Sequence, residues 1–305
     1  MKTITASYNF PPEFLWGIDP GKNLSEDPGN TAFLFQLREN NVNALLLKIP
    51  WNKCEPLKGH FDEAYIESLR SFLGRVKTRG IEPVIIPDTT QIPAWQNLDP
   101  GRNDEESSGF DSFYRYLIEI SIPYAKYYGI YCPRGSLFKK KTIHQALGRF
   151  TELSAYVHSI SDRVKVGLVL PDEFGEKKSS GWILKNEYDF LRTAEADFLG
   201  LRADENVYAA LRSVFGSGRK PVMILSDGTV ENPDQETEDL TADNLYTYWR
   251  FYQEGWPILG YFSGADLPSD QNSHNLYAVC CKNNAFRIST DMPGLSEKWL
   301  RFLKD

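Results

Sequence analysis

The sequence predicts a single (β/α)8 TIM barrel, and three observations support this fold class. Short apolar runs alternate with amphipathic helical segments along the chain, as expected for parallel strands joined by helices. The stretch Trp51–Trp95, together with the apolar run before it, forms one complete strand–helix–strand unit. The length of 305 residues suits a barrel, which typically has roughly 250. Since no linker rich in Pro, Gly or Ser divides the chain, we expect one domain over residues 1–305.

Eight strands are expected, each an apolar run bounded by turn-forming residues. In chain order they are Phe14–Ile18, Ala44–Ile49, Pro83–Ile86, Tyr128–Cys132, Lys165–Leu170, Asp197–Ala203, Pro221–Leu225 and Ile258–Phe262. The C-terminal ends of the strands of a parallel barrel meet on one face, where the following loops build the functional site.

Helical patterns separate these strands. The expected helices are Thr31–Glu39, Phe61–Thr78, Phe113–Ile122, Thr142–Ser159, Asn186–Thr193, Asn206–Phe215, Thr241–Glu254 and a final Ser296–Lys304. Polar stretches that follow strands are expected to be surface loops on the functional face. They are Asp99–Gly109, Glu173–Ser180 and Thr229–Asp239.

Composition narrows the classes of partner and cofactor. The net charge of −7, with no basic run longer than Lys139–Lys141, argues against a nucleic-acid partner. The four cysteines form no CxxC pair and no histidine lies at ligand spacing from them, which argues against a zinc site. We assign no metal-ligating residues and expect no cofactor. The chain has no apolar run of membrane-spanning length and its first residues lack a signal-peptide pattern, so we expect no membrane association and a cytoplasmic location. The aromatic content of 13% suits either a large core or a sugar-binding cleft.

Several motifs, in the right order, resemble glycoside hydrolase family 1, the β-glucosidase-type barrels. Phe10–Gly17 is similar to the family's opening FPxxFxWG, and Trp51–Asp62 matches a WSRIEPxxGxFD stretch nearly position for position. The other matches are Gly80–Pro83 to GIEP, Pro93–Trp95 to PxW, Ala196–Gly200 to DFLG and Gly260–Phe262 to GYF. The resemblance implies a glycosidase-like barrel acting on O-glycosyl bonds, with trimmed catalytic-face loops because this chain is shorter than usual members.

The catalytic positions depart from the family pattern. Cys132 stands where the resemblance places the acid/base Glu, and Ser226 where it places the nucleophile Glu. A retaining glycosidase needs two carboxyl groups roughly 5–5.5 Å apart, which these residues do not supply. A second alignment, through Asp162–Lys165, puts Asp172 at the acid/base position, but the first preserves eight strands. The residues therefore leave open whether the chain is an enzyme.

The sugar-handling positions also differ. The resemblance places the family's strand-two Arg on Lys53, its sugar-binding His on Thr89 and the following Asp on Gln91. Trp51 and Trp95 fall near the sugar site, either as packing residues or as a stacking platform. The candidate substrate-binding set is Trp51, Lys53, Asp88, Thr89, Gln91, Trp95, Asp204 and Asp266.

Acidic residues follow most of the predicted strands. They are Asp19, Asp88, Asp172, Glu173, Asp204, Glu205, Asp227 and Asp266. Three interpretations compete: they cap helix N-termini, they form a rebuilt catalytic pair, or they bind sugar hydroxyls or a Mg²⁺- or Ca²⁺-type ion without catalysis. For the catalytic interpretation the candidates are Asp227, which directly follows an apolar strand, with Asp172 or Glu173.

The leading functional hypothesis is a divergent pseudo-glycosidase that binds carbohydrate or has a regulatory role, without the retaining Glu pair. One alternative is an active glycoside hydrolase or transglycosidase that uses relocated Asp and Glu residues. The other is a non-catalytic scaffold or interaction subunit. The expected partners are a carbohydrate ligand and a protein partner or second copy covering the barrel mouth.

Overall fold

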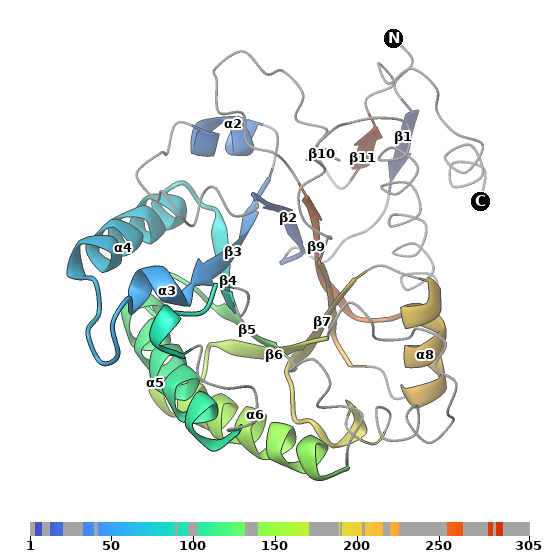
Figure 1. Ribbon diagram of the computed structural model, residues 1–305. Helices are drawn as coiled ribbons and strands as arrows, with labels where there is room; N and C mark the ends of the chain where they lie inside the picture. Colours follow the sequence, from blue (N-terminus) through green and yellow to red (C-terminus); the bar gives the residue numbers. More distant parts are fainter. Residues whose placement is uncertain are drawn as a thin grey trace.

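Eight parallel strands close a barrel in which each strand pairs with its neighbour in chain order and β9 pairs with β2 (Figure 1). The strands are β2 (Leu15–Asp19), β3 (Ala44–Pro50), β4 (Glu82–Asp88), β5 (Tyr127–Tyr131), β6 (Lys165–Val169), β7 (Phe198–Arg202), β8 (Val222–Leu225) and β9 (Ile258–Gly264). The predicted (β/α)8 barrel and all its predicted strands are confirmed. This computed structural model describes residues 4–7, 13–20, 33–39, 42–88, 91–96, 103–131, 140–170, 189, 191–202, 205–215, 220–225, 255–264, 280–282 and 285–288.

Helices surround the barrel (Figure 1). The described helices are α2 (Phe33–Glu39), α3 (Trp51–Cys54), α4 (Glu63–Thr78), the short 3-10 helix η1 (Ala94–Gln96), α5 (Asn103–Ser121), α6 (Lys140–Ile160) and α8 (Glu205–Phe215). The predicted helix at Asn186–Thr193 is helical where it is described, at residue 189 and over 191–193. The predicted helices Thr241–Glu254 and Ser296–Lys304 lie outside the described residues, as do the predicted loops Glu173–Ser180 and Thr229–Asp239.

One predicted loop is wrong over most of its length. Helix α5 starts at Asn103 rather than Phe113, so the stretch predicted as the loop Asp99–Gly109 is helical from Asn103 onward. Asp104, Glu105 and Glu106 carry no apolar periodicity, although acidic residues stabilise the first turn of a helix through its dipole. Hydrophobic spacing alone therefore could not predict that this helix starts at Asn103.

A small antiparallel sheet was not predicted. It has the order β1-β11-β10, from β1 (Ile4–Ser7), β11 (Ala285–Ile288) and β10 (Cys280–Lys282). Ile4 lies opposite Ile288 and Ser7 opposite Ala285, so the sheet joins segments from the two ends of the sequence. Strands of three or four residues are too short to give a periodic signal. A single domain over residues 1–305 stays a prediction.

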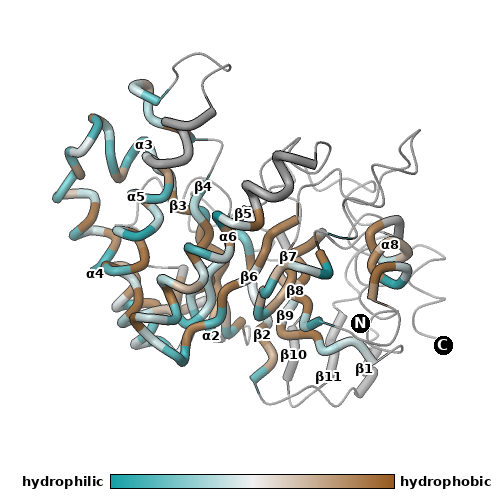
Figure 2. The backbone as a smooth tube through the Cα atoms, turned by 90° about the horizontal axis from the view of Figure 1, so that it is seen from below, coloured by the Kyte–Doolittle hydropathy of each residue, from teal (hydrophilic) through white to brown (hydrophobic). Residues whose placement is uncertain are grey.

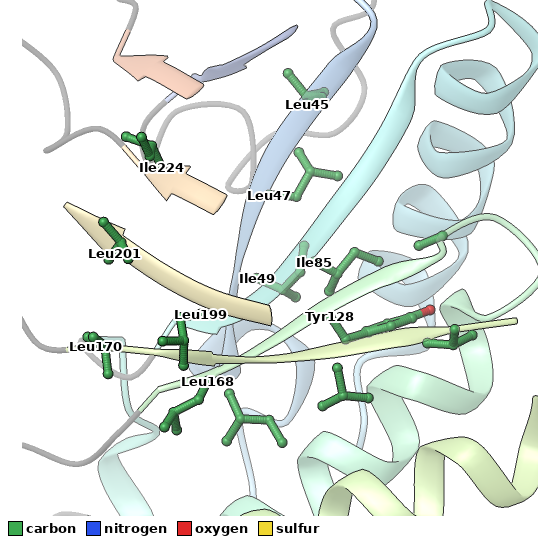
Figure 3. Packing of buried hydrophobic residues seen from close by; sticks show 14 of the residues in the cluster. Leu45, Leu47, Ile49, Ile85, Tyr128, Leu168, Leu170, Leu199, Leu201 and Ile224 are labelled. Carbon is green, nitrogen blue, oxygen red and sulfur yellow. The ribbon is translucent and has the colours of Figure 1, made fainter. Parts of the chain in front are cut away.

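The barrel strands bury side chains on both faces, because successive side chains point to opposite sides of a strand. One set fills the interior: Leu15, Ala44, Leu46, Val84, Ile86, Val169, Phe198, Met223, Leu225 and Phe262. The alternate residues form an outer cluster with the helices, and Figure 3 shows Leu45, Leu47 and Ile49 of β3 within it. Helix α4 contributes Ile66, Leu69, Phe72, Leu73 and Val76. Figure 2 shows hydrophobic stretches along the barrel strands and an α4 that is part hydrophilic, part hydrophobic.

Glycines make room for two large rings inside the barrel. A Cβ atom built on Gly167 would lie 2.1 Å from Phe198 Cε2, and one built on Gly17 would lie 2.1 Å from Phe262 Cδ1. Each distance is far inside van der Waals contact. The rings of Phe198 and Phe262 therefore fill the space that a side chain at Gly167 or Gly17, each on the neighbouring strand, would occupy.

We expect Gly167→Ala to destabilise the protein by about 1–3 kcal/mol, because overpacking forces a buried ring off its rotamer or shifts the backbone. Gly148→Ala is the matched control, since Gly148 is exposed on α6 and its added Cβ would meet nothing within 4 Å. Ala is the better helix former, so this control should be neutral or gain up to about 1 kcal/mol. Urea unfolding followed by circular dichroism compares the two; equal midpoints would show that the interior tolerates a methyl group at Gly167.

Candidate functional site

Polar side chains replace apolar ones where four successive strands reach the C-terminal face of the barrel. On β2 the inward residue Leu15 is followed at even spacing by Asp19, on β3 Leu46 is followed by Lys48, and on β4 Ile86 is followed by Asp88. Tyr131 ends β5 and packs against the interior cluster. We call Asp19, Lys48, Asp88 and Tyr131 the mouth cluster.

The mouth cluster is organised by one ion pair. Lys48 Nζ donates a hydrogen bond to Asp19 Oδ2 at 2.7 Å. Asp19 is 1% exposed and Asp88 is 5% exposed, whereas the Lys48 side chain keeps 26% of its surface accessible. Pro50 follows Lys48 by two positions on β3. Asp88 lies opposite Pro50 on the neighbouring strand β4. Charges buried to this degree are tolerated when they are paired and hydrogen-bonded.

The surroundings keep Lys48 positively charged. Burial lowers the pKa of its ammonium. The negative charge of Asp19 and the hydrogen bond to it raise that pKa, as do the charges of Tyr131 and Asp88, and together they outweigh the effect of burial. An amine nucleophile must be neutral to attack, so Lys48 is unsuited to Schiff-base chemistry. It is instead a fixed cation and hydrogen-bond donor at the barrel mouth.

Trp51 is a core residue rather than an open platform. It is 3% exposed, stacks on Phe113 at a ring separation of 5.6 Å and meets Trp95 edge-on at 5.5 Å. Its Nε1–H donates to Glu55 Oε2 at 2.8 Å. Of the two interpretations from the sequence, the packing role fits Trp51. Trp95 is half-buried, and its Nε1–H donates to the backbone oxygen of Glu55 at 3.1 Å.

Glu55 links helix α3, the turn after it and the segment after β4, and we call this region the rim. Its side chain is buried, with Oε2 accepting from Trp51 and Oε1 accepting from the backbone N–H of Gly59 at 2.7 Å. Gly59 has φ +74°, so the turn after α3 depends on a glycine that the carboxylate holds in place. Next to it, the Asn52 N–H donates to the backbone oxygen of Gln91 at 3.0 Å, which ties α3 to the segment after β4.

The predicted site residues are therefore brought together only in part. Asp88 belongs to the mouth cluster, Trp51 and Trp95 belong to the rim, Gln91 is half-buried beside α3, and Lys53 is exposed on α3. Thr89, Cys132, Asp172, Glu173, Asp204, Ser226, Asp227 and Asp266 lie outside the described residues, and their roles stay predictions. Glu205 begins α8.

Lys48 and Tyr131 are residues that the sequence reading missed. The signal for Lys48 was present, because it is the one charge within the otherwise apolar run ALLLKIP, Ala44–Pro50. A charge inside a buried strand needs a partner, and its inward position points to the C-terminal ends of neighbouring strands. The sequence around Tyr131 did not indicate a site residue, since an aromatic residue at the end of a strand commonly packs in the core.

The described part of the chain offers neither a metal-binding cluster nor a helix that could span a membrane. Over those residues no group of three or more His, Cys, Asp or Glu side chains could hold a metal ion. Over the same residues, no helix combines the length and the apolar character needed to cross a membrane.

The solved structures to which this chain is similar include family 1 β-glucosidase-type barrels. A family 1 β-glucosidase from Thermotoga maritima superposes with a TM-score of 0.61 at 17% identity, covering 83% of this chain and 88% of that one. The β-glycosidase BGL167 superposes with a TM-score of 0.62 at 13% identity, covering 83% and 87%. No family model and no curated protein sequence matches this chain. The similarity to the family 1 barrel is thereby confirmed for the fold.

We expect Glu55→Gln to destabilise the protein by about 1–3 kcal/mol, because an amide turns its NH2 group toward either the buried indole N–H of Trp51 or the part-buried N–H of Gly59, and that donor loses its acceptor. Glu67→Gln is the control, since Glu67 is exposed on α4. Urea unfolding followed by circular dichroism gives the stability of both variants. An unfolding midpoint shared by both variants would contradict the linking role of Glu55.

The Lys48–Asp19 pair also predicts a pH dependence. A lysine whose pKa is raised in the folded state contributes stability that is complete below its unfolded pKa of about 10.4 and is lost as the pH rises through the folded value. The gap in unfolding free energy between the protein and Lys48→Met should thus narrow above about pH 10.4. Lys126→Met, at an exposed lysine, should show no such narrowing. A Lys48 gap that does not narrow above about pH 10.4 would contradict the pairing.

Proposed function

We propose that this chain is a carbohydrate-binding barrel of the glycosidase type that does not use the retaining two-glutamate mechanism. The observation that carries the proposal is the Asp19–Lys48 ion pair, with Asp88 beside it, at the C-terminal face of the barrel. Ligand sites of such barrels lie on this face. A few convergent polar groups at the end of an apolar interior are the usual composition of a small-molecule site.

The burial of the two carboxylates favours binding over catalysis. A catalytic nucleophile has to reach the reacting carbon, yet Asp19 and Asp88 are almost fully covered and Asp19 is occupied by the Lys48 ammonium. Held in this way, they orient Lys48 and its neighbours instead. The Cys132 and Ser226 found at the family's catalytic positions in the sequence favour the same interpretation.

The alternative of an active hydrolase or transglycosidase depends on Asp172, Glu173 and Asp227. In that case one of the first two would act as acid/base and Asp227 as nucleophile. The remaining parts of the proposal are a cytoplasmic location, in which Cys54 stays reduced, and a protein partner or second copy that covers the barrel mouth. Cys54 is buried and forms no disulfide.

We expect saturable binding in calorimetric titrations with a panel of monosaccharides and disaccharides. The panel includes deoxynojirimycin and castanospermine, because the similar β-glucosidase from Thermotoga maritima is described in complex with each of them. Mannitol, an open-chain polyol, controls for unspecific effects of hydroxyl groups. Absence of any heat change or thermal shift across the panel would overturn carbohydrate binding and leave the scaffold hypothesis.

The same preparation is assayed for release of nitrophenol from aryl glycosides, and we expect none above the uncatalysed rate. Turnover that disappears in Asp227→Asn would replace the proposal with the active-enzyme alternative. Turnover that survives Asp227→Asn would also contradict the proposal, and it would exclude Asp227 as the nucleophile.

A further inference from the structure

We infer that two copies of this chain associate through the exposed face of α4, as an antiparallel helix pair related by a two-fold axis at Ser71. This surface lies on the outer side of the barrel, so the inference goes beyond the proposed carbohydrate binding and does not depend on it. It is carried by the exposure of the helix face, by the small residues along it and by charges that complement one another when the helix is reversed.

One face of α4 is packed and the opposite face is exposed. Its buried residues pack inward, and the helix contacts β4, α3 and α5. Figure 1 shows α4 at the outer edge of the barrel. Residues three and four positions apart lie on one side of a helix, so the exposed residues form a single stripe. The stripe consists of Ala64, Glu67, Ser68, Ser71, Arg75 and Thr78.

Small side chains run along the middle of this stripe. Ala64, Ser71 and Thr78 recur every seven residues, which is the repeat that keeps one face of a helix against a second helix. Side chains of this size let two helix axes approach to about 8 Å, the lower end of the range for packed helices. The small residues permit a close contact, and the charges determine which helix makes it.

The charges on this face are arranged so that a reversed copy complements them. Glu63 and Glu67 are exposed near the start of α4, and Arg75 and Arg79 are exposed at its end. In an antiparallel pair, residues equally distant from the two-fold axis lie at the same height on the two helices. With the axis at Ser71, Glu67 is level with Arg75 of the second copy, and this pair occurs twice. A parallel pair would instead set Glu67 beside Glu67.

Contacts within one copy do not prevent this pairing. Glu67 Oε2 lies 3.8 Å from Arg70 Nη1, and the Glu67 side chain is 75% exposed. Exposed ion pairs of this kind are weak. Arg75 Nη1 donates to Ser71 Oγ at 2.9 Å, and a guanidinium has five N–H donors. The helix dipole favours acids at the start and bases at the end of a single helix, and the same polarity favours an antiparallel over a parallel pair.

Two exposed apolar side chains flank the two ends of α4. Leu57 is 65% exposed in the turn that precedes the helix. Phe35 is 54% exposed, and the Arg79 guanidinium lies over its ring at 5.9 Å from the centroid, which places Phe35 at the other end. Reversal therefore brings the Leu57 end of one copy toward the Phe35 end of the other. A helix roughly 24 Å long provides a small interface by itself, so these contacts add area that a specific dimer needs.

Sedimentation velocity of the full chain tests the association over a series from about 1 μM to about 1 mM. We expect monomer at the lower end and a two-copy species at the upper end, because an interface of this size is weak. A monomer throughout the series would overturn the inference. Carbohydrate binding is measured separately by calorimetry, so its failure and the failure of the dimer are distinguishable.

Charge reversal tests the surface. Glu67→Arg and Arg75→Glu should each weaken association by at least about tenfold, since each change brings like charges together twice in a symmetric dimer. The double variant Glu67→Arg with Arg75→Glu should restore association, because the opposite charges face one another again. Glu152→Arg, the same charge change at an exposed site on α6, should associate as the unaltered protein does. Single variants that still dimerise, or a double variant that does not, would overturn the inferred contact.

A cysteine at Ser71 tests the position of the axis. In Ser71→Cys the two new thiols face each other across the axis, where the short separation that a disulfide requires is available. Oxidation with copper phenanthroline should therefore give a covalent dimer on a non-reducing gel. Ala155→Cys, exposed on α6, is the control for the remaining cysteines and for chance collisions. Equal cross-linking of the two variants would overturn the antiparallel arrangement about Ser71.

Discussion

The alternation of side chains across a closed parallel barrel is the constraint on which the rest of this structure depends. Each strand needs apolar side chains on both faces, because one face packs against the helices and the other lines the barrel interior. The outer cluster uses Leu45 and Leu47 of β3, while the interior uses Ala44 and Leu46. Space inside is so limited that Phe198 and Phe262 each lie against a glycine on a neighbouring strand. At the C-terminal ends of β2, β3 and β4 the inward positions become charged, with Asp19, Lys48 and Asp88.

The same constraint explains why a buried ion pair forms at the barrel mouth. An inward charge on β3 is largely shielded from solvent, and an opposite charge within reach lowers the free-energy cost of that burial. Closure of the barrel supplies Asp19 from β2 and Asp88 from β4, the two strands that flank β3. Replacing such a group by an apolar side chain is often neutral or stabilising in proteins. A charged residue kept at this position therefore favours a role in ligand binding, which is the basis of the proposed function.

The motif residues shared with the family 1 barrels have a structural role at the rim. The buried Glu55 holds Trp51 and the Gly59 turn, and its backbone oxygen receives the indole N–H of Trp95. These bonds join α3 to the turn before α4 and to the segment after β4. The resemblance in this stretch thus reflects how the scaffold is built. The mouth cluster beside it is made of different residues, and function has to be argued from those.

The sequence by itself determined the eight strands and most of the helices, because these depend on local apolar periodicity. Parallel-strand geometry also predicted the face on which a site is expected. It also predicted Asp88 as a site residue, since that acid directly follows an apolar run, and the structure places Asp88 at the end of β4. Only the tertiary structure decided that Lys48 meets Asp19, that Trp51 is enclosed by aromatic rings, and that β1 pairs with β11. Each of those contacts joins residues from different elements, and their proximity arises when the barrel closes and the chain ends come together rather than from any local pattern.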